Sequence, residues 1–331
     1  MSELPKRSGS TEIVVKTEGL TKHYGALTAV NGLSLDIYAG EVFGLLGPNG
    51  AGKTTAIHML CGLLKPDAGR VLIHNHPISS DDTENSARVG LCPQAIVLWE
   101  RLTCIEQLEF IGQMYGIRSS EARRRGEKLL EELDLIEKRN KQARTLSGGM
   151  QRRLNMAMAL VHDPEIIVLD EPEAGLDPQS RVRVRDYIHS LSRRKTVILT
   201  THNMDEADRM ADRVAIIDHG QLLVLDTPQN LKRRVGEGDV VEIHLNGCLG
   251  EGVDWEAVQN KARSALADIA PTVTLNSTEH TLHVHALDAT GHLPSIVERL
   301  KIAGMEPATL SIRANTLEDV FIQLTGRTLR E

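Results

Sequence analysis

The segment from Gly47 to Thr54 reads Gly-Pro-Asn-Gly-Ala-Gly-Lys-Thr, which is the phosphate-binding pattern called a P-loop. The apolar segment before it, Glu41 to Leu46, predicts a buried strand, and the pattern after it, up to Leu64, predicts a helix. A glycine-rich turn between a strand and a helix points backbone N–H groups and the positive end of the helix dipole at an anion. The chain is therefore expected to contain an α/β nucleotide-binding domain of the P-loop NTPase class.

Two side chains of this loop carry specific chemistry. Lys53 supplies a positive charge for the β and γ phosphates, and the Thr54 hydroxyl is a ligand for Mg²⁺. The loop alone indicates a nucleotide but does not distinguish one class of P-loop enzyme from another. The residues expected to contact ATP here are Gly47, Pro48, Asn49, Gly50, Ala51, Gly52, Lys53, Thr54 and Thr55.

A second apolar segment, Ile166 to Leu169, ends in the acids Asp170 and Glu171. A carboxylate at a strand tip beside a P-loop holds Mg²⁺ through its waters, which is the role expected of Asp170. Glu171 follows directly, where it would orient and deprotonate the attacking water. The alternative, that the two acids cap the following turn, is weakened by the presence of the P-loop.

The stretch 146–151 reads Leu-Ser-Gly-Gly-Met-Gln and precedes the helical run RRLNMAMAL. A serine and two glycines at the start of a helix form a second anion site, although Ser-Gly-Gly alone is also typical of a loop and helix cap. Together with the P-loop and the 166–171 strand, this stretch resembles the signature motif of the ABC ATPase family, with Met150 at its more variable last position.

The resemblance extends to four further positions. It implies that Tyr24 stacks on adenine and that Gln94 touches Mg²⁺ and water and relays motion to a membrane partner. It also implies that Asp177 belongs to the D-loop that crosses between subunits and that His202 contacts the γ-phosphate. Alone, a turn tyrosine or a single histidine is more often structural. The catalytic residues implied are then Glu171, His202 and Gln94, and the Mg²⁺ ligands are Thr54, Gln94 and Asp170.

The resemblance implies a dimer as well. One chain supplies one P-loop and one signature motif, which lie on opposite sides of the domain in this family. Two copies placed head to tail bring each P-loop opposite the other copy's signature motif. A second copy of the chain is therefore an expected partner, and the residues expected to contact its ATP are Ser147, Gly148, Gly149 and Asp177.

The chain is expected to divide into two domains. Residues 13–235 form the ABC ATPase nucleotide-binding domain. Its first part, 13–38, reads as short strands broken by turn-forming glycines, and later buried strands and intervening helices predict a largely parallel sheet. Residues 95–160 form its helical signature subdomain. Beyond the glycine-containing stretch 235–239, residues 236–331 read strand, helix, strand, strand, helix, strand. This order predicts a small α+β domain of βαββαβ type, closed by a short terminal helix.

Charge and composition limit the partners and the location. The chain has 38 basic and 45 acidic residues and a formal net charge of −7, which argues against a nucleic-acid partner. Its four cysteines show no CxxC spacing and are expected to be free thiols. The first twelve residues lack the apolar core of a signal peptide, and no apolar run reaches the roughly 18 residues that span a bilayer. The expected location is the cytoplasmic face of the cell membrane, with the transmembrane segments in another protein.

The C-terminal part narrows the family resemblance. The ending from Thr316 to Gly326 and the run DTPQNLKRRVG at 226–236 are most similar to ATPases of ABC-2 type exporters in the daunorubicin-resistance drug-export subfamily. This implies an ATP-hydrolysing subunit that powers efflux of a drug-like or lipophilic compound through a separate permease. The alternative is a soluble ABC ATPase that acts on ribosomes or another macromolecule, but such members usually carry two ATPase halves or long coiled coils.

Two features leave alternatives open. Glu173 stands where the family commonly has a small hydroxyl residue, and its carboxylate either raises the cost of binding a polyanion or points into solvent. After Gln94, in the region where the family forms the groove for a coupling helix, stand Trp99 and Phe110. Exposed aromatic rings there suit an interface, whereas buried ones would pack within the helical insert.

Overall fold

The chain forms two compact units in the computed structural model, one ending at Thr227 and one beginning at Pro228. Helix α8 (Pro228–Val235) falls in the second unit because it packs against α11 (Leu317–Thr325). The sequence had placed α8 at the end of the first domain. The structure describes residues 11–78, 87–192, 194–235, 239–245, 255–270, 272–276, 281–286 and 289–326.

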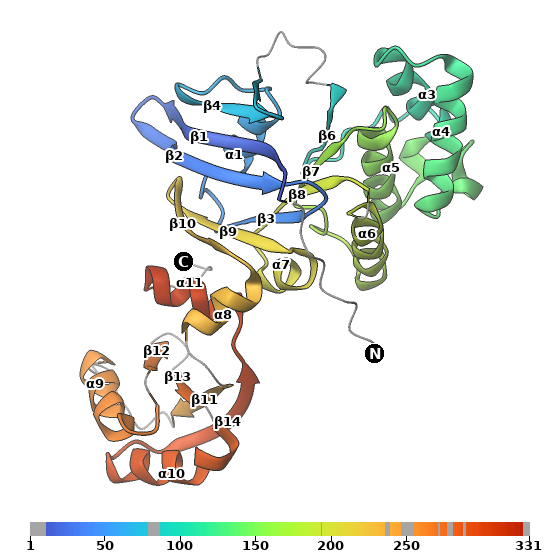
Figure 1. Ribbon diagram of the computed structural model, residues 1–331. Helices are drawn as coiled ribbons and strands as arrows, with labels where there is room; N and C mark the ends of the chain where they lie inside the picture. Colours follow the sequence, from blue (N-terminus) through green and yellow to red (C-terminus); the bar gives the residue numbers. More distant parts are fainter. Residues whose placement is uncertain are drawn as a thin grey trace. The chain divides into compact units, whose positions relative to one another are not determined.

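The first unit is organised around a six-stranded sheet in the order β10-β9-β3-β8-β7-β6 (Figure 1). All neighbouring pairs are parallel except β10 with β9. Because the carboxyl ends of parallel strands share one edge, the segments that follow β3, β6, β7 and β8 meet there. The strands are β3 (Val42–Leu46), β6 (Val89–Cys92), β7 (Ile166–Asp170), β8 (Thr196–Thr201), β9 (Arg213–Asp218) and β10 (Gln221–Asp226).

The six-stranded sheet is buried on both faces. Alternate residues of β7 enter separate cores, with Ile166 and Val168 in one and Ile167 and Leu169 in the other. One core is shared with α1 (Lys53–Leu60) and the antiparallel strands β1, β2 and β4, and the other is shared with helices α3 to α6. This arrangement confirms the predicted parallel sheet covered on both faces.

A second sheet, in the order β2-β1-β4-β5, lies over the first core. The sequence predicted short strands broken by glycines, but β1 and β2 are continuous. Gly19 and Gly32 take positive φ values of 59° and 65° where the register shifts, so they form bulges that bend the strands without ending them. The strands are β1 (Ile13–Tyr24), β2 (Leu27–Tyr38), β4 (Ala68–Ile73) and β5 (His76–Pro77).

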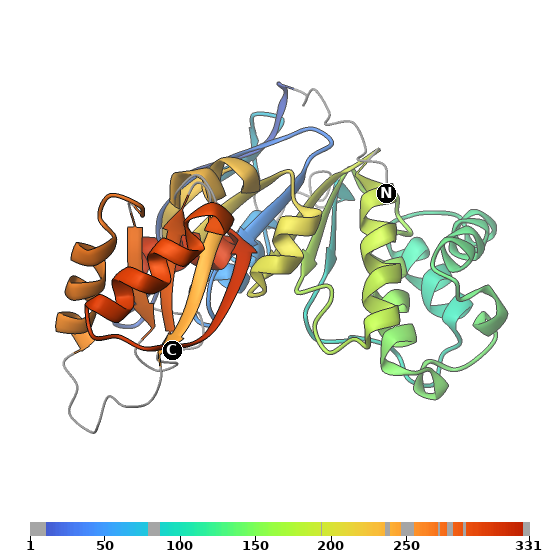
Figure 2. The same cartoon turned by 90° about the horizontal axis from the view of Figure 1, so that it is seen from below.

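Helices cover the other side of the sheet. Figures 1 and 2 agree in placing α3 and α4 beyond α5, away from β1 and β2. The predicted helical insert is thus present, with α5 joining it to β7. The helices are α3 (Cys104–Met114), α4 (Ser119–Glu132), α5 (Gly148–Leu160), α6 (Pro178–Leu191) and α7 (Met204–Met210), with 3₁₀ turns at Ile136–Lys138 and Ala143–Thr145.

The second unit contains an antiparallel sheet in the order β12-β13-β11-β14. Its chain order is β11 (Asp239–Leu245), α9 (Trp255–Leu266), β12 (Thr272–Asn276), β13 (Thr281–Ala286), α10 (Ala289–Ile302) and β14 (Pro307–Ala314). This is the predicted βαββαβ arrangement. One face of the sheet packs on α9 and α10 through an apolar core, and Thr316 caps α11 with a reciprocal capping box.

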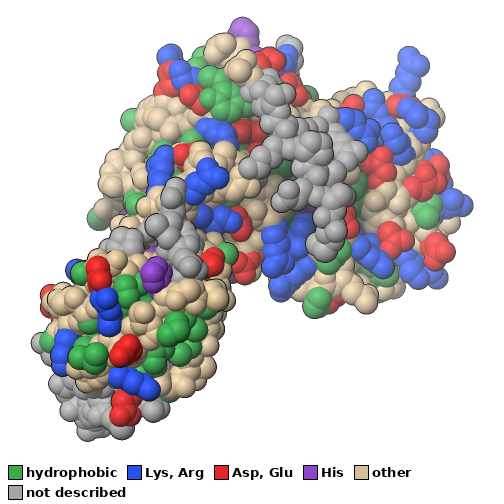
Figure 3. Space-filling view, turned by 60° about the horizontal axis from the view of Figure 1, so that its bottom comes forward, with side chains coloured by type: hydrophobic (Ala, Val, Ile, Leu, Met, Phe, Trp, Pro, Cys, Tyr) green, Lys and Arg blue, Asp and Glu red, His purple; other side chains and the backbone are tan. Residues whose placement is uncertain are grey.

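Surface charges and cysteines agree with the composition. On the right-hand part of the face in Figure 3, basic and acidic side chains lie beside one another. Ion pairs such as Arg124 with Glu121 also bring opposite charges together on α4. Cys61, Cys92 and Cys104 are buried free thiols, and burial raises their pKa values to about 12, 11 and 11. Cys248 lies outside the described residues.

Within the described ranges, no helix is long and apolar enough to cross a membrane.

Candidate active site

The P-loop follows β3 and leads into α1, as the sequence predicted. The buried ammonium group of Lys53 donates to the carbonyl oxygens of Gly47 at 2.7 Å and Pro48 at 3.0 Å. Burial lowers the pKa of Lys53, while the charges of Glu171 and Asp170 act in the opposite direction. The lysine is therefore held inside the loop by carbonyl groups, and its ion pair with Glu171 is the longer contact at 3.9 Å.

Two glycines of the loop are required by the neighbouring backbone. A Cβ atom at Gly47 would lie 2.2 Å from the carbonyl oxygen of Ile217, and one at Gly52 would lie 2.2 Å from that of Ala29. Gly52 also has a φ of 99°, which side-chain-bearing residues rarely adopt. The loop thus passes so close to β9 and β2 that only glycine fits at these points.

Asp170, at the end of β7, meets two hydroxyl groups. Thr54 donates to its Oδ2 at 3.3 Å, and Thr200 donates to its Oδ1. A carboxylate and a hydroxyl beside the P-loop form an all-oxygen set that suits Mg²⁺ bound jointly with phosphates. Over the part of the chain that the structure describes, no group of three or more His, Cys, Asp or Glu side chains could hold a metal ion.

Glu171 is the point where the predicted catalytic side chains meet. Its buried carboxylate lies 3.0 Å from His202 Nδ1, 3.4 Å from Gln94 Nε2 and 3.9 Å from Lys53 Nζ. The backbone of Glu171 has a φ of 48°, a left-handed conformation that costs a non-glycine residue free energy. The strands β3, β6, β7 and β8 each deliver one of these four groups to the same edge of the sheet.

The signature residues form a separate group with the D-loop of the same chain. Ser147 caps α5 by accepting from Met150 N, and Asp177 caps α6 by accepting from the backbone N–H and hydroxyl of Ser180. A Cβ at Gly149 would lie 2.4 Å from the Ser180 hydroxyl, so the two caps are in contact. Among the described residues, no hydrogen bond joins this group to the P-loop.

Tyr24 ends β1 and is 52% exposed. Its ring is therefore open to a planar ligand from solvent.

Glu173 does not point into solvent, so that expectation for it was wrong. Its side chain is fully buried and accepts two hydrogen bonds from Arg185 of α6, at 3.2 Å from Nε and 3.0 Å from Nη2. Sequence reasoning could not find this pair because Arg185 lies on the next helix. The guanidinium group neutralises the extra carboxylate and ties the turn after β7 to α6.

Glu173→Ala is expected to lower the free energy of unfolding by about 2–4 kcal/mol, because it leaves Arg185 without its partner in a largely buried position. Urea denaturation of the isolated protein measures this change. Glu173→Gln, which keeps volume and hydrogen bonding, should lose less. Glu121→Ala is the matched control, since Glu121 pairs with Arg124 and Arg125 at the surface; an equal loss in the control would contradict the prediction.

Arg152 is a site residue that the motifs did not single out. It lies on α5 and is 2% exposed, and its guanidinium group reaches the backbone of both Gln94 and Glu171. The available signal was an arginine pair at the start of a largely apolar helical run, RRLNMAMAL.

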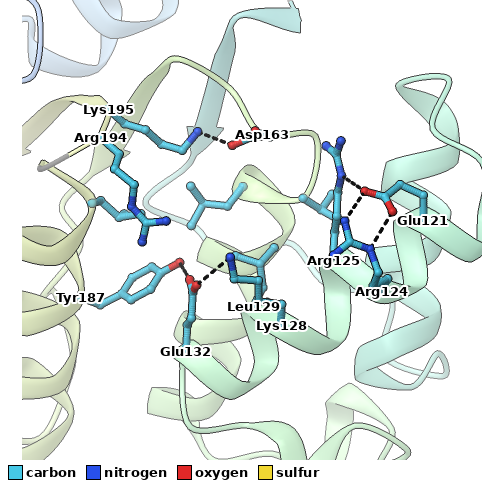
Figure 4. A pocket seen from close by; sticks show the side chains of 13 residues that line it. Glu121, Arg124, Arg125, Lys128, Leu129, Glu132, Asp163, Tyr187, Arg194 and Lys195 are labelled. Atoms are coloured by element: carbon cyan, nitrogen blue, oxygen red, sulfur yellow. Dashed lines mark hydrogen bonds and ion pairs between the residues drawn. The ribbon is translucent and has the colours of Figure 1, made fainter.

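A cavity of about 280 Å³ lies away from these residues, between α4 and α6 (Figure 4). Lys195 and Asp163, which pair at its rim, come just before β8 and β7, and Tyr187 donates to Glu132 across it. This cavity is therefore at the amino edge of the sheet, opposite the edge that carries the P-loop.

Comparison with known proteins agrees with this geometry. The ABC transporter family model matches residues 30–174. A linearmycin resistance ATP-binding protein of Bacillus subtilis (strain 168) is 35% identical over 96% of this chain and 100% of that protein. A daunorubicin/doxorubicin resistance ATP-binding protein of Streptomyces peucetius is 36% identical over 94% and 92%. A Nod factor export ATP-binding protein of Ralstonia nicotianae is 38% identical over 98% and 97%.

Solved structures give the same fold. A dimeric bacterial ABC transporter cassette is 28% identical, with a TM-score of 0.60 over 64% of this chain and 98% of the other. An ATP-binding subunit of an ABC transporter is 26% identical, with a TM-score of 0.61 over 67% and 92%. Since relatives above 30% identity align over almost their full length and the nucleotide motifs meet at one edge of the sheet, the chain belongs to the ATP-binding subunits of the ABC transporter family.

Proposed function

We propose that this protein is the ATP-hydrolysing subunit of an ABC-2 type exporter and powers efflux of a drug-like or lipophilic compound through a separate membrane permease. The observation that carries the proposal is the convergence of Lys53, Gln94 and His202 on the Glu171 carboxylate. The similarity to resistance and export proteins over nearly the whole chain supports export and favours it over action on ribosomes.

Each group at the sheet edge has a defined part in hydrolysis. Glu171 would take the proton of the attacking water, which His202 and Gln94 help to orient. Lys53 would exchange its carbonyl partners for the β and γ phosphates. Bound Mg²⁺ would neutralise charge on those phosphates, and Thr54, Asp170 and Gln94 would hold it.

The second anion site at the start of α5 supports a dimer. Ser147, Gly148 and Gly149 lie at a helix N-terminus, where backbone donors and the helix dipole favour a phosphate. Because no hydrogen bond in the described part of the chain joins these residues to their own P-loop, we assign them, with Asp177, to the ATP of a second copy. Tyr24 would stack on the adenine of its own chain. Similarity to dimeric cassettes supports this assembly.

An exposed apolar surface follows Gln94 in the sequence and suits a membrane subunit. Trp99 and Phe110 pack edge to face with ring centroids 5.2 Å apart, and both remain more than 40% exposed, together with Ile96 and Val97. Aromatic residues left exposed beside Gln94 are well placed to bind a helix of a permease. The subunit would then sit at the cytoplasmic face of the cell membrane as a peripheral protein.

Transport in vesicles tests this proposal. The chain is expressed with an ABC-2 type permease, and inside-out vesicles are given fluorescent daunorubicin as the probe. We expect uptake that needs ATP and Mg²⁺ and that is lost with EDTA or with the Glu171→Gln subunit. If the protein is recovered with ribosomes and not with membranes in cells that make the permease, the exporter assignment is wrong.

A further inference from the structure

The Arg152 side chain uses every hydrogen-bond donor it has. Its Nη1 donates to the carbonyl oxygens of Pro93 at 2.6 Å and Gln94 at 3.0 Å. Its Nη2 donates to those of Asp170 at 2.6 Å and Glu171 at 2.8 Å, and its Nε donates to that of Pro172 at 3.3 Å. A guanidinium group has five N–H donors in a planar fork, so all five are satisfied by backbone carbonyls.

These five carbonyls belong to two segments that are distant in sequence. Residues 93–94 follow β6 and residues 170–172 end β7, and the two strands are neighbours in the sheet. Arg152 itself comes from a third segment, the signature helix α5, one turn after Ser147. A single side chain therefore fixes the backbone under Gln94 and Glu171, whose own side chains meet at 3.4 Å.

The conformation of Glu171 gives this contact its significance. Successive carbonyls of an extended strand point in opposite directions, yet those of Asp170 and Glu171 both accept from Arg152 Nη2. The left-handed backbone at Glu171, with φ of 48°, lets the second carbonyl turn toward the same nitrogen. Such a strained residue persists only where surrounding contacts over-determine it, and Arg152 supplies three of those contacts, at residues 170 to 172.

We propose that Arg152 is a positioning residue for ATP hydrolysis, which holds Glu171 and Gln94 in one fixed arrangement and ties both to the signature helix. This inference rests on the proposed role of Glu171 as the base. Helix α5 is rigid and begins at the second anion site. A displacement of its first turn would therefore move Arg152 and, through the hydrogen bonds of Arg152 to the backbone, the carboxylate of Glu171. Lysine cannot replace it, since an ammonium group has three donors and no planar fork.

The test compares Arg152→Lys with Arg153→Lys. Arg153 is the next residue of the same helix and is also buried, but it donates to the carbonyls of Leu133 and Asp134, away from the site. Steady-state ATPase assays and a fluorescent ATP analogue measure kcat, KM and the dissociation constant. We expect Arg152→Lys to lower kcat by about 10- to 100-fold, as a misplaced catalytic group does. The dissociation constant should stay within about threefold, and Arg153→Lys should keep kcat within about twofold.

A double substitution separates positioning from general loss of structure. In protein that already carries Glu171→Gln, Arg152→Lys should lower the residual kcat little further, because both changes act through the same group. An equal kcat for the two lysine variants, or fully additive losses in the double variant, would overturn the proposal. So would loss of the cooperative thermal transition in both Arg152→Lys and Arg152→Gln. If Glu171→Gln itself leaves wild-type turnover, the proposed base is wrong, a result that is distinct from failure of Arg152 alone.

Discussion

Lys53→Ala protein is expected to bind ATP at least about 100-fold more weakly than the wild type. The Lys53 ammonium group lies inside the P-loop on two backbone carbonyls, ready to donate to phosphate oxygens. Hydrogen bonds to a charged group contribute about 1.5–3 kcal/mol each, and two of them correspond to at least two decades of affinity. Titration with a fluorescent ATP analogue in the presence of Mg²⁺ measures the change.

Lys195→Ala is the matched control for this experiment. Lys195 also donates to a backbone carbonyl, that of Pro164, and pairs with Asp163, but it lies at the amino edge of the sheet. Its substitution should leave ATP affinity unchanged. If Lys53→Ala bound ATP as tightly as Lys195→Ala, the assignment of the phosphate site to residues 47–54 would be wrong.

Glu171→Gln is expected to lower kcat by about 10²–10⁴-fold, the usual contribution of a general base, while ATP binding is kept. The substitution preserves volume and hydrogen bonding but removes the carboxylate that would accept a proton. Because ATP is then held without turnover, the ATP-bound dimer should accumulate. Single-turnover assays follow the chemical step, and gel filtration with ATP and Mg²⁺ follows the dimer.

The control for Glu171 lies at the other end of the same strand. Glu165 precedes β7 and pairs with His74 at 2.7 Å, so Glu165→Gln removes a carboxylate from another Glu–His pair at the opposite edge of the sheet. Turnover in that variant should match the wild type. Near-normal hydrolysis by Glu171→Gln would refute Glu171 as the base, and loss of turnover in both variants would show that the effect is not local.

Much of the fold and of the site could be predicted, because each motif is short and the strand or helix that flanks it lies next to it in the sequence. A P-loop needs a strand before it and a helix after it, and a strand ending in two acids needs only its own residues to be found. Parallel strands then place Gln94, Glu171 and His202 at one edge, since the carboxyl ends of β6, β7 and β8 coincide. The alternation of strands and helices after residue 239 was likewise enough to predict the second unit.

Contacts between segments distant in sequence could not be predicted. Glu173 was expected to disturb the phosphate site or face solvent, because nothing near it in sequence announces Arg185 on α6. The two glycines of β1 and β2 were expected to end strands, but pairing across the sheet carries both strands through them as bulges. In each case the free energy of a tertiary contact outweighed the local preference of the residue.

The P-loop and its companion motifs thus determined by sequence alone that this protein is a nucleotide-binding ABC ATPase, and they predicted which side chains would surround the nucleotide. Only the tertiary structure decided how those side chains are held. Five carbonyls of two separate loops converge on Arg152, and backbone carbonyls leave no trace in a sequence. Every residue type carries the same backbone carbonyl acceptor, so only the folded structure shows which carbonyls a buried guanidinium group will bind.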